Sequence, residues 1–378
     1  MTSAPLWTAA EIARATGGRW LVAPPEPWAP RRISYDVTGN MAGHFCVLVH
    51  PTSWGQSRRD PTEDIPRLAL QGAAGLMVER GHLETLARQG RQLPAGLPVL
   101  VVPSTWAGLQ DMARIARMRF RGKVFAVTGT VGKTTTREMI RHLAGRQGGA
   151  TASAANNNNI SGVHRSLAYM PRDNAAGVIE MGFGKPLDGI ERSSLIAQPD
   201  VAVLTTIEVA HFDMFTPKML EAASGSHLLL HYKMQVLAGL VPGGAAVLNA
   251  DLPDYALARA FAERRTNRVH GFGSAVDSDA RLGAAELDIS GSRAQITLLG
   301  RPYVLQLQVP GRHMLINALA ALLAVAVAGF DVDQAVADMA LFEPVAGRAR
   351  VLRAALPGGG DATIIDDSFN ATLASMRS

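Results

Sequence analysis

A glycine-containing loop between an apolar run and a helix-forming run has the clearest chemistry in this sequence. The run from Val124 to Val127 has the length and β-branched content of a buried parallel strand. Residues 129–134 then read Gly-Thr-Val-Gly-Lys-Thr. In such a loop, backbone N–H groups and the helix N-terminus bind polyphosphate, Lys133 reaches the β- and γ-phosphates, and Thr134 ligates Mg²⁺. The sequence therefore predicts a nucleotide-binding site here, with an ordinary strand-to-helix turn as the alternative.

Polar side chains follow two other strand-like runs of the same region. Glu180 ends the run that begins at Gly177, and His211 follows the run 201–207. The carboxyl ends of parallel strands form the ligand crevice of an open sheet, where a carboxylate can hold the metal of a phosphate-binding loop. The alternatives are a glutamate that only begins a loop and a histidine with a structural role.

Two more features are ambiguous from the residues alone. Residues 156–159 are four consecutive asparagines, which usually form a flexible loop but can also bind carboxylate or phosphate oxygens at a strand end. Lys233 lies in a helical stretch, 222–240, where an isolated lysine is normally a solvated surface charge.

The elements that must position these residues predict an α/β fold. A chain of 378 residues exceeds a single core and indicates two or three domains. Before the loop, short apolar strands alternate with helices, one of which begins at Thr8 with Glu11 in the capping-box position. The strand candidates there are 45–49, 75–78 and 99–102, and helix 106–120 leads into the loop region. Residues 280–309 read as antiparallel strands, and an alanine-rich helix follows.

The composition excludes several classes of protein. The chain is 47% hydrophobic with a formal charge of +5, and no dense Lys/Arg cluster is interleaved with aromatic residues as in a nucleic-acid reader. A mildly basic protein with small anionic substrates is the simpler interpretation. The single cysteine, Cys46, is expected to be buried and suits a reducing compartment. We find no signal peptide, and the longest apolar stretch, 315–330, is too short for a membrane span, so we expect a cytoplasmic protein.

The order of these motifs resembles the Mur ligase family, whose members join a carboxylate to an amine with ATP. Thr128–Thr135 matches the family's T-G-T-x-G-K-T-T loop, and residues 156–167 are similar to its N-x-N-N-x-x-G-V run. Residues 311–320 look like the adenine segment G-x-H-x-x-x-N-A-x-A, and residues 366–371 resemble the D-D-x-Y-N-A turn. Within the family, the best match is to the members that add D-alanyl-D-alanine to a UDP-muramoyl tripeptide.

The resemblance implies a role for individual residues. Thr134 and Glu180 would hold one Mg²⁺, and His211 and a carbamoylated Lys233 would hold a second. The spacing from Lys233 to Asn249 matches that of the family's carbamoylated lysine, whereas the longer gap from His211 implies an insertion between 213 and 230. The implied catalytic residues are Lys133, Glu180, His211 and Lys233; the nucleotide-binding residues are Gly129, Thr130, Gly132, Lys133, Thr134, Thr135, Asn317, Arg348 and Asp367; the substrate-binding residues are Asn156, Asn158 and Asn159.

The N-terminal region departs from the family pattern. Family members usually bind uridine diphosphate with D-S-R, and Asp36-Val37-Thr38 stands in that place. The missing serine hydroxyl and arginine remove anion partners, so we predict that UDP-muramoyl peptides bind poorly. The family's D-G-H loop is also absent near residues 53–64.

The family architecture implies three domains: a small α/β substrate domain at 1–118, an ATPase domain at 119–348, and the beginning of a Rossmann-like domain at 349–378. The ATPase domain would have a mostly parallel sheet plus a smaller antiparallel sheet. A third domain needs roughly another hundred residues, so we expect a truncated form, or a short variant that needs a partner. The predicted function is an ATP-dependent carboxylate–amine ligase acting through an acyl phosphate. The alternatives are a ligase for another carboxylate and amine, a P-loop NTPase or phosphotransferase, and a catalytically idle binding protein.

Overall fold

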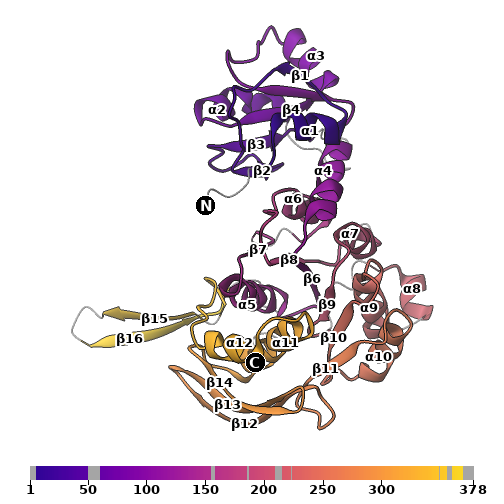
Figure 1. Cartoon of the computed structure of the whole chain (residues 1–378), viewed down its shortest axis with the longest axis vertical. Coiled ribbons are helices and arrows are strands. Elements are labelled where there is room, and N and C mark those ends of the chain that lie inside the picture. Colours follow the sequence, from indigo (N-terminus) through magenta and orange to yellow (C-terminus); the bar gives the residue numbers. More distant parts are fainter. Residues whose placement is uncertain are drawn as a thin grey trace. The chain divides into compact units, whose positions relative to one another are not determined.

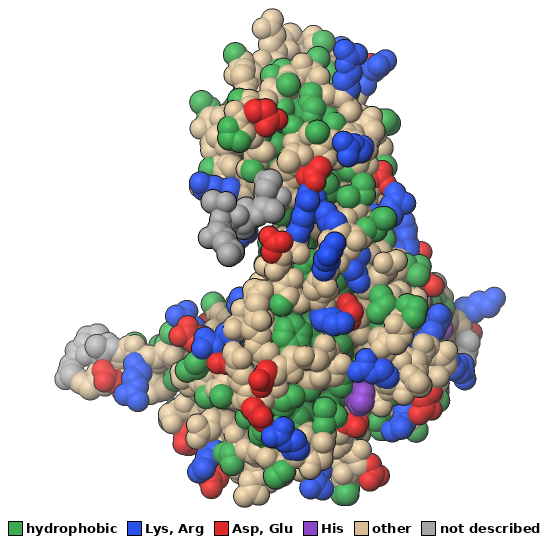
Figure 2. All heavy atoms as spheres, viewed as in Figure 1, with side chains coloured by type: hydrophobic (Ala, Val, Ile, Leu, Met, Phe, Trp, Pro, Cys, Tyr) green, Lys and Arg blue, Asp and Glu red, His purple; other side chains and the backbone are tan. Residues whose placement is uncertain are grey.

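The chain folds into two compact units, one formed by residues 1–121 and 164–173, the other by residues 122–163 and 174–378 (Figure 1). The computed structural model describes residues 6–49, 60–154, 158–184, 187–208, 215–222, 224–348, 350–355 and 360–368. Each unit has its own sheet, and the predicted α/β class is confirmed. Acidic and basic side chains are interspersed on the face seen in Figure 2. In the part of the chain that the structure describes, no helix is long and apolar enough to cross a membrane.

The first unit is built on a five-stranded sheet with the order β1-β5-β4-β3-β2, in which only β1 is antiparallel to its neighbour. Helix α1 begins at the predicted capping box, because the Thr8 hydroxyl accepts from the N–H of Glu11 and the Glu11 carboxylate accepts from the N–H of Thr8. Cys46 is fully buried, and burial raises the pKa of its thiol to about 12. The strands are β1 (Arg19–Val22), β2 (Arg32–Ser34), β3 (His44–Val47), β4 (Gly75–Glu79) and β5 (Val99–Val102); the helices are α1 (Ala9–Thr16), η2 (Pro61–Asp64), α2 (Ile65–Leu70), α3 (Arg80–Arg88) and α4 (Thr105–Arg119).

The second unit contains a nine-stranded sheet with the order β14-β13-β12-β11-β10-β9-β6-β8-β7. Its strands are parallel from β7 to β12, and β13 and β14 then add in antiparallel fashion. Because β12 pairs with β11, the antiparallel strands extend the parallel sheet. The sequence had predicted a smaller antiparallel sheet in addition to the parallel one. The strands are β6 (Lys123–Thr128), β7 (Ala150–Ala152), β8 (Ala176–Glu180), β9 (Val201–Leu204), β10 (Ala245–Asn249), β11 (Val269–Gly273), β12 (Ala280–Asp288), β13 (Gly291–Leu298) and β14 (Arg301–Leu307).

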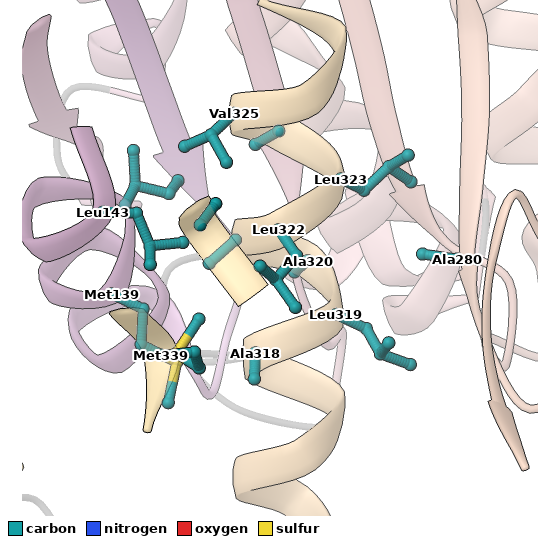
Figure 3. Packing of buried hydrophobic residues seen from close by; sticks show 14 of the residues in the cluster. Met139, Leu143, Ala280, Ala318, Leu319, Ala320, Leu322, Leu323, Val325 and Met339 are labelled. Atoms are coloured by element: carbon teal, nitrogen blue, oxygen red, sulfur yellow. The ribbon is translucent and has the colours of Figure 1, made fainter. Parts of the chain in front are cut away.

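Helices α5 (Lys133–Arg146), α11 (Arg312–Val327) and α12 (Val332–Met339) share one apolar core with this sheet. Figure 3 shows Met139 and Leu143 of α5 directed toward the α11 side chains. Helix α11 is apolar around most of its circumference because neighbours surround it, as its fully buried residues 318–325 show. The core anchors α5 through residues 139–144, and this helix begins where the phosphate-binding loop ends.

The predicted helical stretch at 222–240 is divided in the structure. The stretch 222–240 was expected to be one helix, but α9 begins only after Ser224, whose side chain caps it, and ends before a separate 3₁₀ turn. A two-stranded hairpin follows the main sheet. Helix α6 (Ile160–Ala168) begins in the second unit and ends in the first. The other elements are α7 (Gly189–Ala197), α8 (Pro217–Ala222), α9 (Gly225–Met234), η4 (Gln235–Leu237), α10 (Tyr255–Glu263), β15 (Arg350–Ala355) and β16 (Asp361–Asp366).

Candidate active site

The predicted phosphate-binding loop connects β6 to α5 and requires glycine at two positions. Gly129 has a φ of +149°, and a Cβ atom there would lie 1.9 Å from the Thr205 hydroxyl oxygen. Gly132 has a φ of +85°, and a Cβ atom there would lie 2.4 Å from the Asn317 side-chain oxygen. Both conformations are unfavourable for residues with a side chain. The loop is therefore held in shape by close contacts with residues distant in sequence.

The end of β9 supports the loop from the neighbouring strand. The Thr205 hydroxyl lies 2.7 Å from the carbonyl oxygen of Val131 and 3.1 Å from that of Thr128. The N–H of Thr130 donates to the carbonyl of Thr206 at 2.6 Å. The predicted strand 201–207 ends at Leu204. The N–H of Thr205 still donates to Thr128 of β6, but the Thr205 hydroxyl and the carbonyl of Thr206 bond to loop residues.

Lys133 and Lys233 both donate into this loop from different helices. The Lys133 ammonium donates to the carbonyl of Thr130 at 2.8 Å, and the Lys233 ammonium donates to the carbonyl of Gly129 at 2.8 Å. Burial lowers the pKa of Lys133, an effect that Glu180 opposes. Burial lowers the pKa of Lys233 to well below its usual range, and the charge of Lys133 lowers it further. Lys233 is only 1% exposed, which excludes the solvated surface charge that the sequence alone favoured.

Glu180 ends β8 beside the loop and is 2% exposed. Its Oε2 atom accepts from the Thr134 hydroxyl at 2.9 Å and from Arg137 at 3.1 Å, and its Oε1 atom accepts from the Asn158 amide at 2.9 Å. A threonine hydroxyl and a carboxylate in contact beside a phosphate-binding loop match the protein groups that hold Mg²⁺ in P-loop proteins.

Such a site needs few carboxylates. Mg²⁺ is usually held by one or two of them together with substrate phosphates and water. Among the residues that the structure describes, no group of three or more His, Cys, Asp or Glu side chains is placed to bind a metal. Thr134 and Glu180 fit a Mg²⁺ ion whose other ligands come from phosphates and water.

The model for the Mur ligase middle domain matches residues 127–325, just over half of the chain. The chain belongs to the Mur ligase family. It is 28% identical to UDP-N-acetylmuramoyl-tripeptide–D-alanyl-D-alanine ligase of Escherichia coli K12, covering 85% of this chain and 66% of that protein. It is 25% identical to the Bacillus subtilis enzyme of the same name, covering 75% of this chain and 58% of that protein. The chain thus spans less than two thirds of the length of these relatives.

Solved structures of Mur ligases share the fold. MurF from Acinetobacter baumannii superposes with a TM-score of 0.78 at 24% identity, covering all of this chain and 75% of that one. MurF ligase from Thermotoga maritima, solved in complex with ADP, gives a TM-score of 0.68 at 25% identity over 92% of this chain and 73% of that one.

Other residues predicted from the Mur ligase motifs surround the same loop. Asn317 of α11 accepts from the Thr136 hydroxyl at 3.4 Å, and Arg348 donates to the Thr134 hydroxyl at 3.1 Å. Asp367 is close enough to oppose the lowering of the His313 pKa that burial causes. Thr135 is buried on α5.

The Mur ligase asparagine run divides into different roles. Asn158 holds Glu180, whereas Asn159 accepts from the N–H of Gly162 at 2.8 Å, which is a helix cap at the start of α6. Asn156 and His211 lie outside the described residues, so their predicted roles stay predictions.

Three contacts in this Mur ligase site were not anticipated from the sequence. Arg137 pairs with Glu180, the Ser153 hydroxyl accepts from the N–H of Glu180 at 3.1 Å, and Thr205 buttresses the loop. Only Arg137 had a local signal, because it lies one helical turn after Lys133 and therefore on the same face of α5.

Proposed function

We propose that this Mur ligase chain binds Mg·ATP and forms an amide bond between a carboxylate and an amine through an acyl phosphate. The observation that best supports the proposal is the contact between Thr134 and Glu180 beside a loop that also receives Lys133. The relatives' names support the same class of reaction. We also propose the division into a substrate domain at 1–118, an ATPase domain at 119–348 and the start of a third domain at 349–378.

The residues of the loop would bind and orient the nucleotide. Loop N–H groups and Lys133 would hold the β- and γ-phosphates, and Thr134 and Glu180 would hold Mg²⁺. When bound, Mg²⁺ supplies positive charge against the phosphoryl group being transferred. Asn317 would contact the nucleotide because it lies against Gly132, and Arg348 would orient the Thr134 hydroxyl.

Lys233 is suited to become a carbamate. Its lowered pKa favours the neutral amine, whose lone pair can attack CO₂ to form an N–C bond with release of one proton. The product is an anion beside the Lys133 ammonium, so the two groups attract each other. A carbamate oxygen is also a ligand of the kind that Mg²⁺ prefers. We propose that this oxygen and His211 together bind a second Mg²⁺ ion.

The reaction consists of two displacements. A carboxylate oxygen of the first substrate attacks the γ-phosphorus and ADP leaves; the amine of the second substrate then attacks the acyl carbon and phosphate leaves. UDP-N-acetylmuramoyl tripeptide and D-alanyl-D-alanine are the first pair to test, because they appear in the relatives' names. Thr38 donates to Asp36 at 2.8 Å and Val37 is buried, which supports the prediction that this region binds a UDP-muramoyl peptide weakly.

Trapping with hydroxylamine tests the proposal. The chain is incubated with Mg·ATP, hydroxylamine and one candidate carboxylate at a time, and both ADP and hydroxamate are measured. A ligase gives hydroxamate in proportion to ADP with one of the carboxylates, and the Glu180→Gln variant gives neither. ADP release without hydroxamate for every carboxylate would identify an NTPase instead.

A further inference from the structure

Arg137 places its guanidinium between two carboxylates in the interior of the second unit. Its Nη1 atom donates to Glu180 at 3.1 Å, and its Nε and Nη2 atoms donate to one oxygen of Glu138 at 3.1 Å and 2.8 Å. The side chains of Arg137 and Glu180 are 3% and 2% exposed. A charge pair so deeply buried is sensitive to the loss of either partner, because the remaining charge is left uncompensated.

Glu138 is itself fixed from its other side. Its second oxygen accepts from Arg141 at 2.6 Å, and Arg141 is 46% exposed at the surface of α5. Charges of alternating sign therefore run from Arg141 through Glu138 and Arg137 to Glu180. Because Arg137 uses two of its nitrogen atoms on Glu138, it keeps an ionic partner even when Glu180 turns to another cation.

The contact with Glu180 occupies the oxygen that faces Thr134. Oε2 accepts from both Thr134 and Arg137, whereas Oε1 accepts from Asn158. A metal held jointly by Thr134 and Glu180 needs a lone pair of Oε2 and repels the guanidinium. Arg137 and a metal therefore compete for the same carboxylate oxygen.

We infer that Arg137 is the counter-ion of Glu180 in the metal-free site and yields this carboxylate to Mg²⁺ when the nucleotide binds. The inference rests on the proposed function, since it concerns the Mg·nucleotide complex at the same loop. Arg137 is a positioning residue: it holds the buried carboxylate beside Thr134 until the metal arrives and then stays paired with Glu138.

Thermal unfolding of the whole chain with ADP in EDTA, and with ADP and Mg²⁺, tests the inference. In EDTA, Arg137→Met should lower the unfolding temperature of the nucleotide-binding unit by on the order of 5 °C. With Mg·ADP the metal replaces the missing cation, so at least half of this deficit should disappear. Arg141→Met is the matched control, because it removes a pair with Glu138 but none with Glu180; its deficit should be small and equal in both buffers.

The outcomes separate the inference from the proposed function. An Arg137→Met deficit of the same size in both buffers would show a purely structural arginine and overturn the inference alone. No stabilisation of the unmodified chain by Mg·ADP would overturn the proposed function and the inference with it. If Arg137→Met does not fold, Arg137→Lys is the second variant. It keeps a cation, but an ammonium cannot bind two carboxylates with the geometry of a guanidinium. In calorimetric titrations at several Mg²⁺ concentrations, the ADP affinity of Arg137→Lys should reach half of its maximum at a several-fold lower Mg²⁺ concentration than that of the unmodified chain. The same Mg²⁺ dependence in both proteins would contradict the competition.

Discussion

At the scale of single residues, the site concentrates positive charge that a polyphosphate would neutralise. Lys133 and Lys233 donate to adjacent loop carbonyls, and each has a lowered pKa because it is buried. Arg348 lies at Thr134, and among these groups Glu180 carries the negative charge. An anionic ligand gains more electrostatic binding free energy at such a loop than at a solvent-exposed patch, because buried charges are weakly screened.

Replacing Lys133 by alanine removes the ammonium expected at the β- and γ-phosphates. We predict that Lys133→Ala weakens ADP binding by about 10- to 100-fold, the loss expected for a charge-assisted hydrogen bond, while the fold is retained. Lys123→Ala is the control, because Lys123 is on β6 but pairs with Asp200 at the surface. Isothermal titration calorimetry measures both variants, and ADP affinity of Lys133→Ala equal to that of the control would remove Lys133 from the nucleotide site.

Lys233 makes stability depend on pH in a defined direction. Its folded-state pKa is lowered, so the unfolded chain binds more protons wherever the pH lies between that value and the usual 10.5. The free energy of unfolding contributed by this group therefore increases with pH across that window, by up to about 1.4 kcal/mol per pH unit. We expect unfolding by urea in CO₂-free buffers from pH 7 to 10 to show this slope, and Lys233→Met to lack it. Parallel pH profiles for the two proteins would contradict the prediction.

At the scale of elements, local patterns predicted the loop and its flanks, but contacts between distant segments did not follow from them. Strand β6, the glycines and the start of α5 are encoded within a few consecutive residues, as is the capping box at Thr8. The pair between Arg137 and Glu180 and the contact of Asn317 with Gly132 depend instead on how α5, β8 and α11 pack. Lys233 is the clearest case: its helix shows no local reason for burial, and only spacing within the Mur ligase pattern indicated a role.

The N-terminus of α5 depends on glycine, whereas its last turn does not. Gly132→Ala forces a side chain into a positive φ and against Asn317, so we predict a loss of about 1–3 kcal/mol in unfolding free energy and weaker ADP binding. Gly145→Ala is the matched control on the same helix, because its Cβ atom would meet nothing closer than 3.7 Å. It should stabilise the chain by about 0.5–1 kcal/mol through helix propensity. Urea unfolding of the two variants should therefore shift in opposite directions, and shifts in the same direction would show that the contact with Asn317 is not restrictive.

At the scale of the whole molecule, the chain has separate hydrophobic cores in two units, and one segment of the first unit lies within the sequence of the second. Residues 164–173 follow the asparagine run in sequence but belong to the first unit. There, the carbonyl of Ala168 accepts from the buried indole of Trp7 at 2.6 Å, and Arg172 pairs with Glu11. The first unit is thus completed by residues that the chain supplies after the phosphate-binding loop, which a division based on sequence order alone does not reveal.

Because each unit has its own core, we predict that calorimetric unfolding of the chain resolves two transitions that respond to different changes. Mg·ADP should raise only the transition temperature of the second unit, since a ligand stabilises the unit that binds it. Trp7→Phe should lower the transition temperature of the first unit only. The expected loss in its free energy of unfolding is about 1–3 kcal/mol, because the buried carbonyl of Ala168 loses its donor. The ADP affinity of Trp7→Phe serves as the control and should equal that of the unmodified chain. A single transition that moves with both changes would mean that the two cores unfold as one cooperative body, so that a nucleotide bound at Lys133 would also stabilise the N-terminal sheet.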